Sequence, residues 1–322
     1  MKKPRRRCGS CTMRRETGCR GVARQLAWKI STLARNGTVR MPVVYGVMTH
    51  EEHPGPDVLL LERLRGVPVE APTRTPARWE QLQEQIVEAL LAWHRQDSGG
   101  CVGMVDNTQE NLWPNWYRQR VEILWSTLNL YQDTGLTMQD KRLLFRSREC
   151  LPELFRDFND NAVLVHGNFT LRSMLKDPRS DQLLAMVGPG MMLWAPREYE
   201  LFRLAEGGQA EQLLWRYLQQ APVSEAFVWR RWLYLLWDEV DSLVNTGRFD
   251  RARFDLAAKS FQPLPDATKG FIADPVAVHQ PHWRRNGPLP RIERRGHRQL
   301  IGRRGKRIQA GMAKEYHRPR KV

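Results

Sequence analysis

The chain has 322 residues and a mass of 37.6 kDa, enough for one large domain or two lobes around a sizeable hydrophobic core. Its hydrophobic content of 41% is ordinary for a soluble globular protein, and no apolar run approaches the ~20 residues of a transmembrane helix. The five cysteines are scattered and odd in number, which favours reduced thiols in the cytoplasm over a disulfide framework. We therefore expect a cytoplasmic protein with no membrane partner.

The net charge of +16 is confined to the two ends of the chain. Residues 1–20 contain 8 basic residues and 1 acidic residue, and residues 263–322 contain 15 basic and 4 acidic residues, whereas the stretch between them has 28 basic and 30 acidic residues. Because both ends also lack an apolar stripe, we expect residues 1–21 to be a disordered basic arm and residues 263–322 a disordered basic tail. The arginine-rich tail would then bind nucleic acid only incidentally.

The first predicted elements after the basic arm are one helix and two strands. Apolar residues recur at helical spacing over 22–34, and the apolar runs at 43–48 and 57–64 predict strands separated by a turn that is rich in proline and glycine. Thr75 is placed to cap a helix over about 76–96, whose first residue is a proline, a favoured choice at that position.

The second half of the ordered region is predicted to be mostly helical, with three short strands in its middle. The turn Asp177–Ser180 is expected to join the last two strands as a hairpin. In chain order, we predict helices at about 112–132 and 138–158, strands at 162–166, 173–176 and 182–187, and helices near 197–205, 208–219, 223–247 and 251–260.

A pattern with chemical meaning lies between the first two of those strands. The apolar run Val163–Val165 is followed at once by His166 and Gly167, and then by the polar residues Asn168 and Ser173. This order is typical of the loop that serves phosphoryl transfer, in which a carboxylate accepts the proton of the substrate hydroxyl and an amide helps to hold magnesium. Here a neutral amide, Asn168, and a hydroxyl, Ser173, stand at those two positions.

The segments around this loop together resemble the aminoglycoside phosphotransferase and choline kinase family over roughly residues 22–250. The family loop H-G-D-x-x-x-x-N corresponds to residues 166–173. The resemblance implies an α+β, two-lobed protein-kinase-like fold, with an incomplete N-terminal lobe over 22–66 and a mainly helical C-terminal lobe over 67–262. The other segments that carry it are Met41–Gly46, Leu60–Gly66, Leu90–His94 and Trp194–Leu201.

The resemblance also implies where ATP would bind. Glu62, Arg63 and Leu64 match the hinge whose backbone holds adenine, and His166 matches a residue that supports the loop. The strands that carry the family's glycine-rich turn and phosphate-contacting lysine would fall before Val22, where only the basic arm exists. We therefore expect binding of ATP with magnesium to be weak or absent.

Further positions depart from the family's phosphate machinery. Gly188 stands where the family has its metal-binding Asp, so we expect no metal held by this strand. Asp177 and Asp181 lie nearby in the sequence, and we interpret both as solvated turn residues. Lys29 is expected to be a surface residue of the first helix. Gln25, near the place of the helix Glu that pairs with the family's lysine, is uncharged.

These substitutions decide the expected function. The leading interpretation is a degenerate pseudokinase that acts by binding a small molecule or a protein partner. The alternatives are an active ATP-dependent small-molecule phosphotransferase with atypical catalytic residues, and weak nucleic-acid binding through the arginine-rich tail. Trp113 and Trp116 are candidates for a substrate pocket, whereas Trp229, Trp232 and Trp237 recur at helical spacing and are expected in the core.

Overall fold

The structure is a computed structural model that describes residues 21–49, 57–131, 134–204 and 207–261. The predicted basic tail, the predicted basic arm up to residue 20 and the turn between the first two strands lie outside these residues.

The helices are α1 (Val22–Asn36), α2 (Pro76–His94), α3 (Trp113–Leu128), α4 (Met138–Glu149), α5 (Leu151–Leu154), α6 (Glu198–Leu201), the 3-10 helix η1 (Phe202–Leu204), α7 (Gly208–Gln220), α8 (Phe227–Thr246) and α9 (Arg251–Phe261). The strands are β1 (Val44–Met48), β2 (Val58–Leu61), β3 (Val67–Pro68), β4 (Cys101–Met104), β5 (Asn107–Glu110), β6 (Ala162–Val165), β7 (Met174–Lys176), β8 (Leu183–Met186) and β9 (Leu193–Pro196).

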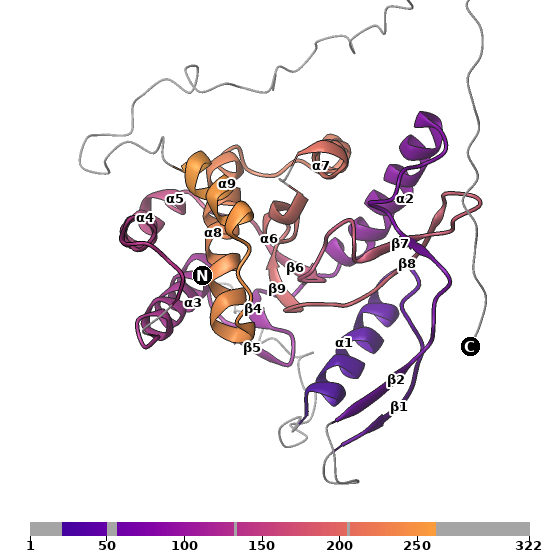
Figure 1. Cartoon of the computed structure of the whole chain (residues 1–322), viewed down its shortest axis with the longest axis horizontal. Coiled ribbons are helices and arrows are strands. Elements are labelled where there is room, and N and C mark those ends of the chain that lie inside the picture. The colour runs from indigo at the N-terminus through magenta and orange to yellow at the C-terminus, as the bar shows by residue number, and fades with distance from the viewer. Residues whose placement is uncertain (1–20, 50–56, 132–133, 205–206, 262–322) are drawn as a thin grey trace, which may run out of the picture. The chain divides into compact units, whose positions relative to one another are not determined.

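The first structural unit is helix α1 beside the antiparallel pair β1–β2 (Figure 1). Leu59 and Leu61 pack towards the hydrophobic core, whereas the opposite face of the pair exposes Tyr45, Met48 and Leu60. In the described part of the chain no further strand pairs with β1 or β2. The predicted helix and both strands are present, and the buried stripe of α1 consists of Ala23, Ala27, Ile30, Thr32 and Leu33.

A four-stranded antiparallel sheet with the order β5-β4-β9-β6 was missed by sequence analysis except for β6. β4 and β5 form a hairpin around Val105 and Asp106, and the polar side chains of β5 give no apolar alternation that would reveal a strand. β9 pairs with β6, for example Trp194 opposite Leu164. The sheet positions the candidate site, because β6 leads directly to residue 166 and β9 leads directly to α6.

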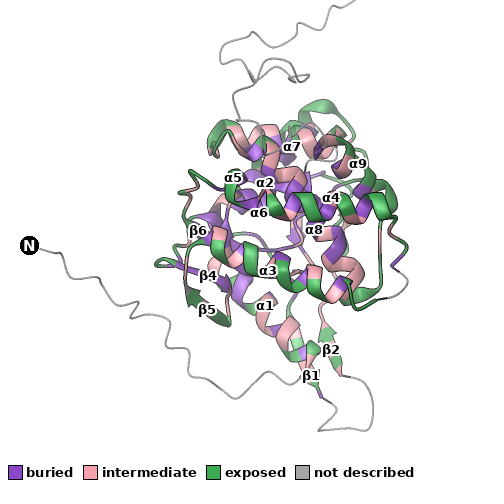
Figure 2. Ribbon diagram, turned by 90° about the vertical axis from the view of Figure 1, so that its left-hand side faces the viewer, coloured by how far each residue is buried: buried purple, intermediate pink, exposed green. Residues whose placement is uncertain are grey.

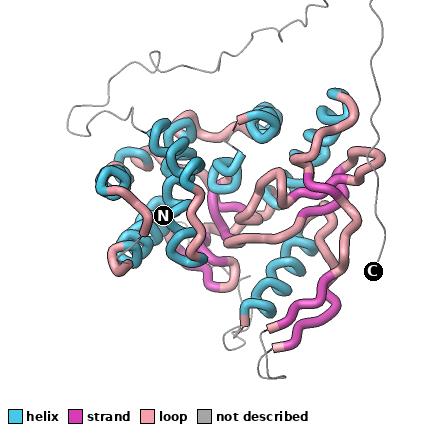
Figure 3. The backbone as a smooth tube through the Cα atoms, viewed as in Figure 1, coloured by secondary structure: helices cyan, strands magenta, loops and turns pink. Residues whose placement is uncertain are grey.

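The predicted hairpin of β7 and β8 is present, and the short strand β3 pairs with the other side of β7 (Figure 3). The carboxylate of Asp177 accepts hydrogen bonds from the backbone N–H groups of Arg179 and Ser180 and so closes the turn.

Helix α2 begins where it was predicted, since the Thr75 hydroxyl accepts a hydrogen bond from the backbone N–H of Arg78. Its main contacts include β6 and β8, so α2 spans the two sheets that flank the candidate loop.

The remaining helices pack around α8, which contacts α3, α6 and α9. Trp237 is buried and its two predicted companions on α8 are partly buried against the core. The helix predicted over 138–158 is divided into α4 and α5, because Pro152 has no N–H with which to continue the helical hydrogen bonding across Cys150. Figure 2 shows the buried residues concentrated around α2, α6 and α8. Among the described residues, no helix is both long and apolar enough to cross a membrane.

Candidate functional site

Strand β6 ends in the loop that sequence analysis singled out. All four residues of β6 are buried, so the strand fixes the backbone immediately before His166. The His166 ring is itself buried and stacks on Trp93, with the ring centroids 5.6 Å apart and an interplanar angle of 16°. Burial lowers the pKa of His166 to about 3, and the charge of Arg203 acts in the same direction, although the Asn168 backbone opposes them. The neutral ring therefore contributes packing to the loop.

The backbone of the loop is held by a buried carboxylate from α6. Glu200 accepts the backbone N–H of His166 and, at 3.2 Å to each oxygen, that of Gly167. Its side chain is fully buried, and desolvation raises its pKa to about 7 against the opposing effects of Arg203 and these N–H groups. Glu200 lies within the segment Trp194–Leu201, and no role was predicted for it. It reaches the loop only because β9 pairs with β6.

Two glycines let the loop press against the segment that follows β8. Gly167 has a φ of +79°, and a Cβ added there would lie 2.1 Å from the carbonyl oxygen of Met191. A Cβ added at Gly190 would lie 2.4 Å from the carbonyl oxygen of Gly167. The Gly190 N–H donates to the His166 carbonyl at 3.1 Å. Any side chain at either position would force these two backbone segments apart.

This close approach brings together residues 168 and 188, which the family resemblance aligns with a catalytic base and a metal ligand. The side-chain amide of Asn168 donates to the backbone carbonyl of Gly188 at 2.8 Å. Neither residue carries a charge, and Asn168 has no carboxylate with which to accept a proton from a substrate hydroxyl. The resemblance pointed to both residues, and the structure shows that they contact each other.

Ser173 faces into its own loop. Its hydroxyl donates to the Thr170 carbonyl at 2.9 Å and accepts the Thr170 N–H at 3.0 Å, and the residue is 6% exposed. The hydroxyl thus closes a tight turn between residues 170 and 173. Ser173 contacts the segment before Gly188 through its backbone instead, since its carbonyl accepts the Val187 N–H at 2.8 Å.

Lys29 is a polar residue of this site that sequence analysis interpreted wrongly. It was expected on the surface, but the side chain is half-buried and its ammonium group donates to the carbonyl of Gly190 at 2.8 Å. Desolvation lowers the pKa of Lys29, and the negative charge of Asp106 opposes that effect. The two bonded residues are 161 positions apart, so the helical periodicity of α1 carries no information about this contact.

The predicted hinge leaves β2 as an extended segment. Glu62 forms an ion pair with Arg40 and accepts the backbone N–H of Val43 at 3.3 Å, so its carboxylate is used in fixing the start of the segment. Within the described residues, no backbone hydrogen bond is made by Arg63 or Leu64. Their backbone groups are therefore available to a ligand, as a hinge requires.

The interpretation of Asp181 as a solvated turn residue is wrong, whereas Asp177 behaves as a turn residue. Asp181 is 4% exposed and lies 3.0 Å from the ammonium group of Lys176, which is itself buried. Its carboxylate also accepts the backbone N–H of Arg74 at 3.1 Å. That hydrogen bond, together with Lys176, holds the pKa of Asp181 below its ordinary value against the cost of burial. Asp181 is thus committed to a buried ion pair that anchors the hairpin.

The two tryptophans proposed for a substrate pocket lie in packed structure. Trp113 is 3% exposed, stacks on Trp116 with centroids 5.0 Å apart, and donates its indole N–H to the Tyr234 hydroxyl at 3.2 Å. Trp116 in turn covers Gly103, where an added Cβ would lie 2.6 Å from the indole nitrogen. These contacts assign both side chains to packing between α3, α8 and the central sheet.

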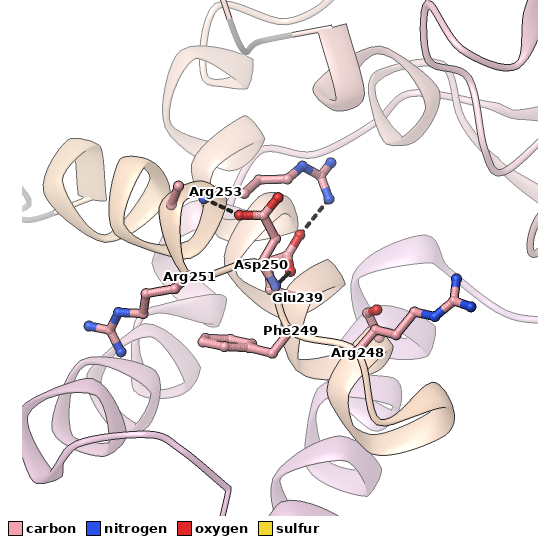
Figure 4. Close-up of a pocket in the computed structure, with 8 residues that line it drawn as sticks. Glu239, Arg248, Phe249, Asp250, Arg251 and Arg253 are labelled. Carbon is pink, nitrogen blue, oxygen red and sulfur yellow. Dashed lines mark hydrogen bonds and ion pairs between the residues drawn. The ribbon is translucent and has the colours of Figure 1, made fainter. Parts of the chain in front are cut away.

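A cavity lies elsewhere, where α8 turns into α9 (Figure 4). Arg253 contacts the Glu239 carboxylate at 2.6 Å, and the same carboxylate accepts the backbone N–H of Asp250 at 3.0 Å. Glu239 is thus bonded within the cavity, whereas Arg251 pairs with Asp140 and Asp255 outside its lining. Its lining residues are Glu239, Ser242 and 248–253, which include none of the predicted site residues.

The residues at the candidate site do not fit magnesium. Among the described residues, no three carboxylate, imidazole or thiol groups converge on a possible metal position. Gly188 has no side chain, the Ser173 hydroxyl is bonded within its own turn, and the ammonium group of Lys29 lies against the segment where the metal would be. Magnesium prefers anionic oxygen ligands in octahedral geometry, and a cation in this position repels it.

Comparison with known proteins gives an independent view of this arrangement. A sequence profile described as the phosphotransferase enzyme family matches residues 22–235. The protein named uncharacterized protein YcbJ from Escherichia coli strain K12 is 76% identical over 251 residues, which cover 78% of this chain and 84% of that protein. The same degree of identity is found with the protein of that name from Shigella flexneri.

Two solved structures are similar in fold at low sequence identity. A candidate fructosamine-3-kinase from Haemophilus somnus 129PT has a TM-score of 0.57 and 16% identity, covering 74% of this chain and 78% of that chain. Aminoglycoside phosphotransferase APH(4)-Ia, in a ternary complex with ADP and hygromycin B, has a TM-score of 0.55 and 15% identity, covering 74% of this chain and 81% of that chain. Another complex of this enzyme holds AMP-PNP in place of ADP. The expected α+β, kinase-like fold is confirmed.

Proposed function

The chain belongs to the phosphotransferase enzyme family, and from that premise we propose that it is a pseudokinase, which binds a ligand in the family's cleft without transferring a phosphoryl group. The observation that supports this most strongly is the 2.8 Å hydrogen bond from the Asn168 amide to the Gly188 carbonyl. It joins the position of the catalytic base to the position of a metal ligand, and neither residue has the group that its role requires.

The consequence for chemistry follows from the acid–base properties of an amide. A catalytic Asp is anionic at neutral pH and can accept the proton of a substrate hydroxyl as that hydroxyl attacks phosphorus. The Asn168 amide can orient a hydroxyl by a hydrogen bond but cannot take up its proton. With the base and the metal ligand both lost, the geometry supports binding and orientation of a ligand alone.

The ligand we propose is a nucleotide held at the hinge formed by Glu62, Arg63 and Leu64. The backbone groups of Arg63 and Leu64 make no hydrogen bond within the described part of the chain, which leaves them for the edge of an adenine ring. The similar aminoglycoside phosphotransferase binds ADP and AMP-PNP. The Arg40–Glu62 ion pair would fix the start of the hinge whether or not nucleotide is bound.

The test is ATP consumption by the full chain with magnesium and a panel of hydroxylated substrates, aminoglycosides and ketosamines among them. We expect no turnover above the background of a protein-free sample. Asn168→Ala is measured beside the parent, and Asn161→Ala, at an exposed residue just before β6, serves as the matched control.

The proposal fails if the parent consumes ATP and Asn168→Ala alone lowers the rate steeply. That outcome would establish the alternative, an active phosphotransferase in which the amide orients the substrate. A parent rate that is unchanged by Asn168→Ala and is removed by further purification would instead indicate a contaminating activity.

A further inference from the structure

The ammonium group of Lys29 lies against the 188–190 segment, whose residue 188 the family resemblance aligns with a metal-binding Asp. Its single hydrogen bond to a described residue goes to the Gly190 carbonyl at 2.8 Å. An ammonium group has three N–H donors, so two remain for another acceptor. The chain therefore places a fixed positive charge, supplied by α1, against the 188–190 segment.

Other donors flank this charge. The Asn168 side chain contacts the same segment through Gly188, and a Cβ added at Gly190 would lie 3.0 Å from the Asn168 Cβ, so the loop and the Lys29 contact are adjacent. Within the described residues, the backbone N–H of Gly188 donates to no acceptor, and Gly188 is exposed. An ammonium group, a side-chain amide and an unused backbone N–H are donors of the kind that bind an anion, and all three belong to or contact the 188–190 segment.

Few acidic groups of the described residues lie near the site. Asp106, in the exposed turn between β4 and β5, is the carboxylate whose charge acts on Lys29, and it makes no ion pair with that ammonium group. Glu200 lies on the buried side of the loop, where its oxygens are occupied by backbone N–H groups. The exposed side of the 188–190 segment thus carries no carboxylate of its own.

We propose that Lys29, with the Asn168 amide and the Gly188 N–H, forms a metal-independent binding site for the phosphate groups of a ligand. The lysine replaces the divalent cation that an active family member would need at this position. This inference rests on the proposed function, since it concerns the phosphate end of the same cleft, and it adds that binding proceeds without magnesium. A purely structural Lys29 would tie α1 to the 188–190 segment and make no difference to which ligands bind.

The experiment is calorimetric titration of the full chain with ADP, adenosine and inorganic pyrophosphate, each in EDTA and in excess magnesium. We expect ADP to bind at least as tightly in EDTA as in magnesium. Lys29→Gln should weaken binding of ADP about ten- to a hundredfold, the range for loss of a hydrogen bond to a charged group, and leave adenosine unchanged. The matched control is Lys259→Gln. Lys259 lies on α9, which packs mainly against α8.

Gly188→Asp tests the site without removing the Lys29 contact. A Cβ at Gly188 would meet only the Asn168 amide nitrogen, at 3.8 Å, so the side chain has room. The φ of +61° at Gly188 is one that Asp tolerates better than most residues. The added carboxylate should weaken binding of ADP in EDTA severalfold, and magnesium should then restore it. Thermal unfolding of each variant confirms that it is folded before binding is compared.

The outcomes separate this inference from the proposed function. Equal ADP affinity in the parent and Lys29→Gln, or binding that requires magnesium, overturns the anion site, and so does a parent that binds neither ADP nor pyrophosphate. Magnesium-dependent ATP turnover measured on the same samples decides the proposed function separately. If pyrophosphate binds with the expected dependence on Lys29 and ADP does not, the site is supported and its ligand is a phosphorylated compound other than a nucleotide.

Discussion

The groups that support the 166–173 loop are buried, whereas the two positions with a possible chemical role, residues 168 and 188, lie at the surface. Glu200 holds the loop backbone from beneath, and the Trp93–His166 stack packs its base. The chemical positions, Asn168 and Gly188, instead bond to each other at the exposed surface. The supporting hydrogen bonds go to backbone N–H groups, which every residue type except proline provides. The shape of such a loop therefore does not depend on a carboxylate at residue 168.

The largest expected effect comes from the deepest part of the support. Arg230 donates to both oxygens of Glu198, each at 2.7 Å, and both side chains are almost fully buried. Arg230→Met would leave the Glu198 carboxylate buried with Tyr234 as its remaining side-chain donor. We expect the free energy of unfolding to fall by about 3–5 kcal/mol, measured by urea denaturation.

The double variant Glu198→Leu with Arg230→Met is the control for that prediction. It removes both charges together, so most of the lost stability should return. A cost below about 1 kcal/mol for Arg230→Met alone would contradict the view that this pair anchors α6, and with it the position of Glu200.

The second effect concerns Glu200 and depends on pH. Its pKa is about 7 in the folded chain against 4.5 for an ordinary Glu side chain. Between those values the folded state holds more protons than the unfolded state, so this group stabilises the fold at low pH and its contribution is lost as pH rises through 7. The loss amounts to up to about 3 kcal/mol for a fully buried group.

Glu200→Gln isolates this contribution, because every other titrating group is common to both proteins. The buried histidines His94 and His166, whose pKa values are lowered to about 3, destabilise both proteins equally as pH falls below 6.5. We expect the stability of Glu200→Gln relative to the parent to increase from pH 4.5 to pH 8, measured by urea denaturation at several pH values. A difference that stays constant with pH would show that Glu200 has an ordinary pKa.

The sequence predicted the elements whose signals are local. Helical periodicity and the cap at Thr75 located α1 and α2, and an apolar run located β6. β5 was missed because its four residues, Asn107 to Glu110, are all polar.

The roles of Lys29 and Glu200 were missed for another reason. Each depends on a partner that only the folded chain brings close, 161 residues away for Lys29 and 33 and 34 for Glu200.

The smallest effect is expected at the chemical position itself. The hydrogen bond from Asn168 to the Gly188 carbonyl is solvent-exposed, and water can replace the amide when Asn168→Ala removes it. We expect Asn168→Ala to change the free energy of unfolding by no more than about 1 kcal/mol. Ser173→Ala is the comparison and should cost more, because it removes a buried hydroxyl that both donates and accepts a hydrogen bond. Urea denaturation of the two variants side by side decides the order. If Asn168→Ala proved the more damaging, residue 168 would belong to the support of the loop, and its amide would be retained for structure in place of ligand binding.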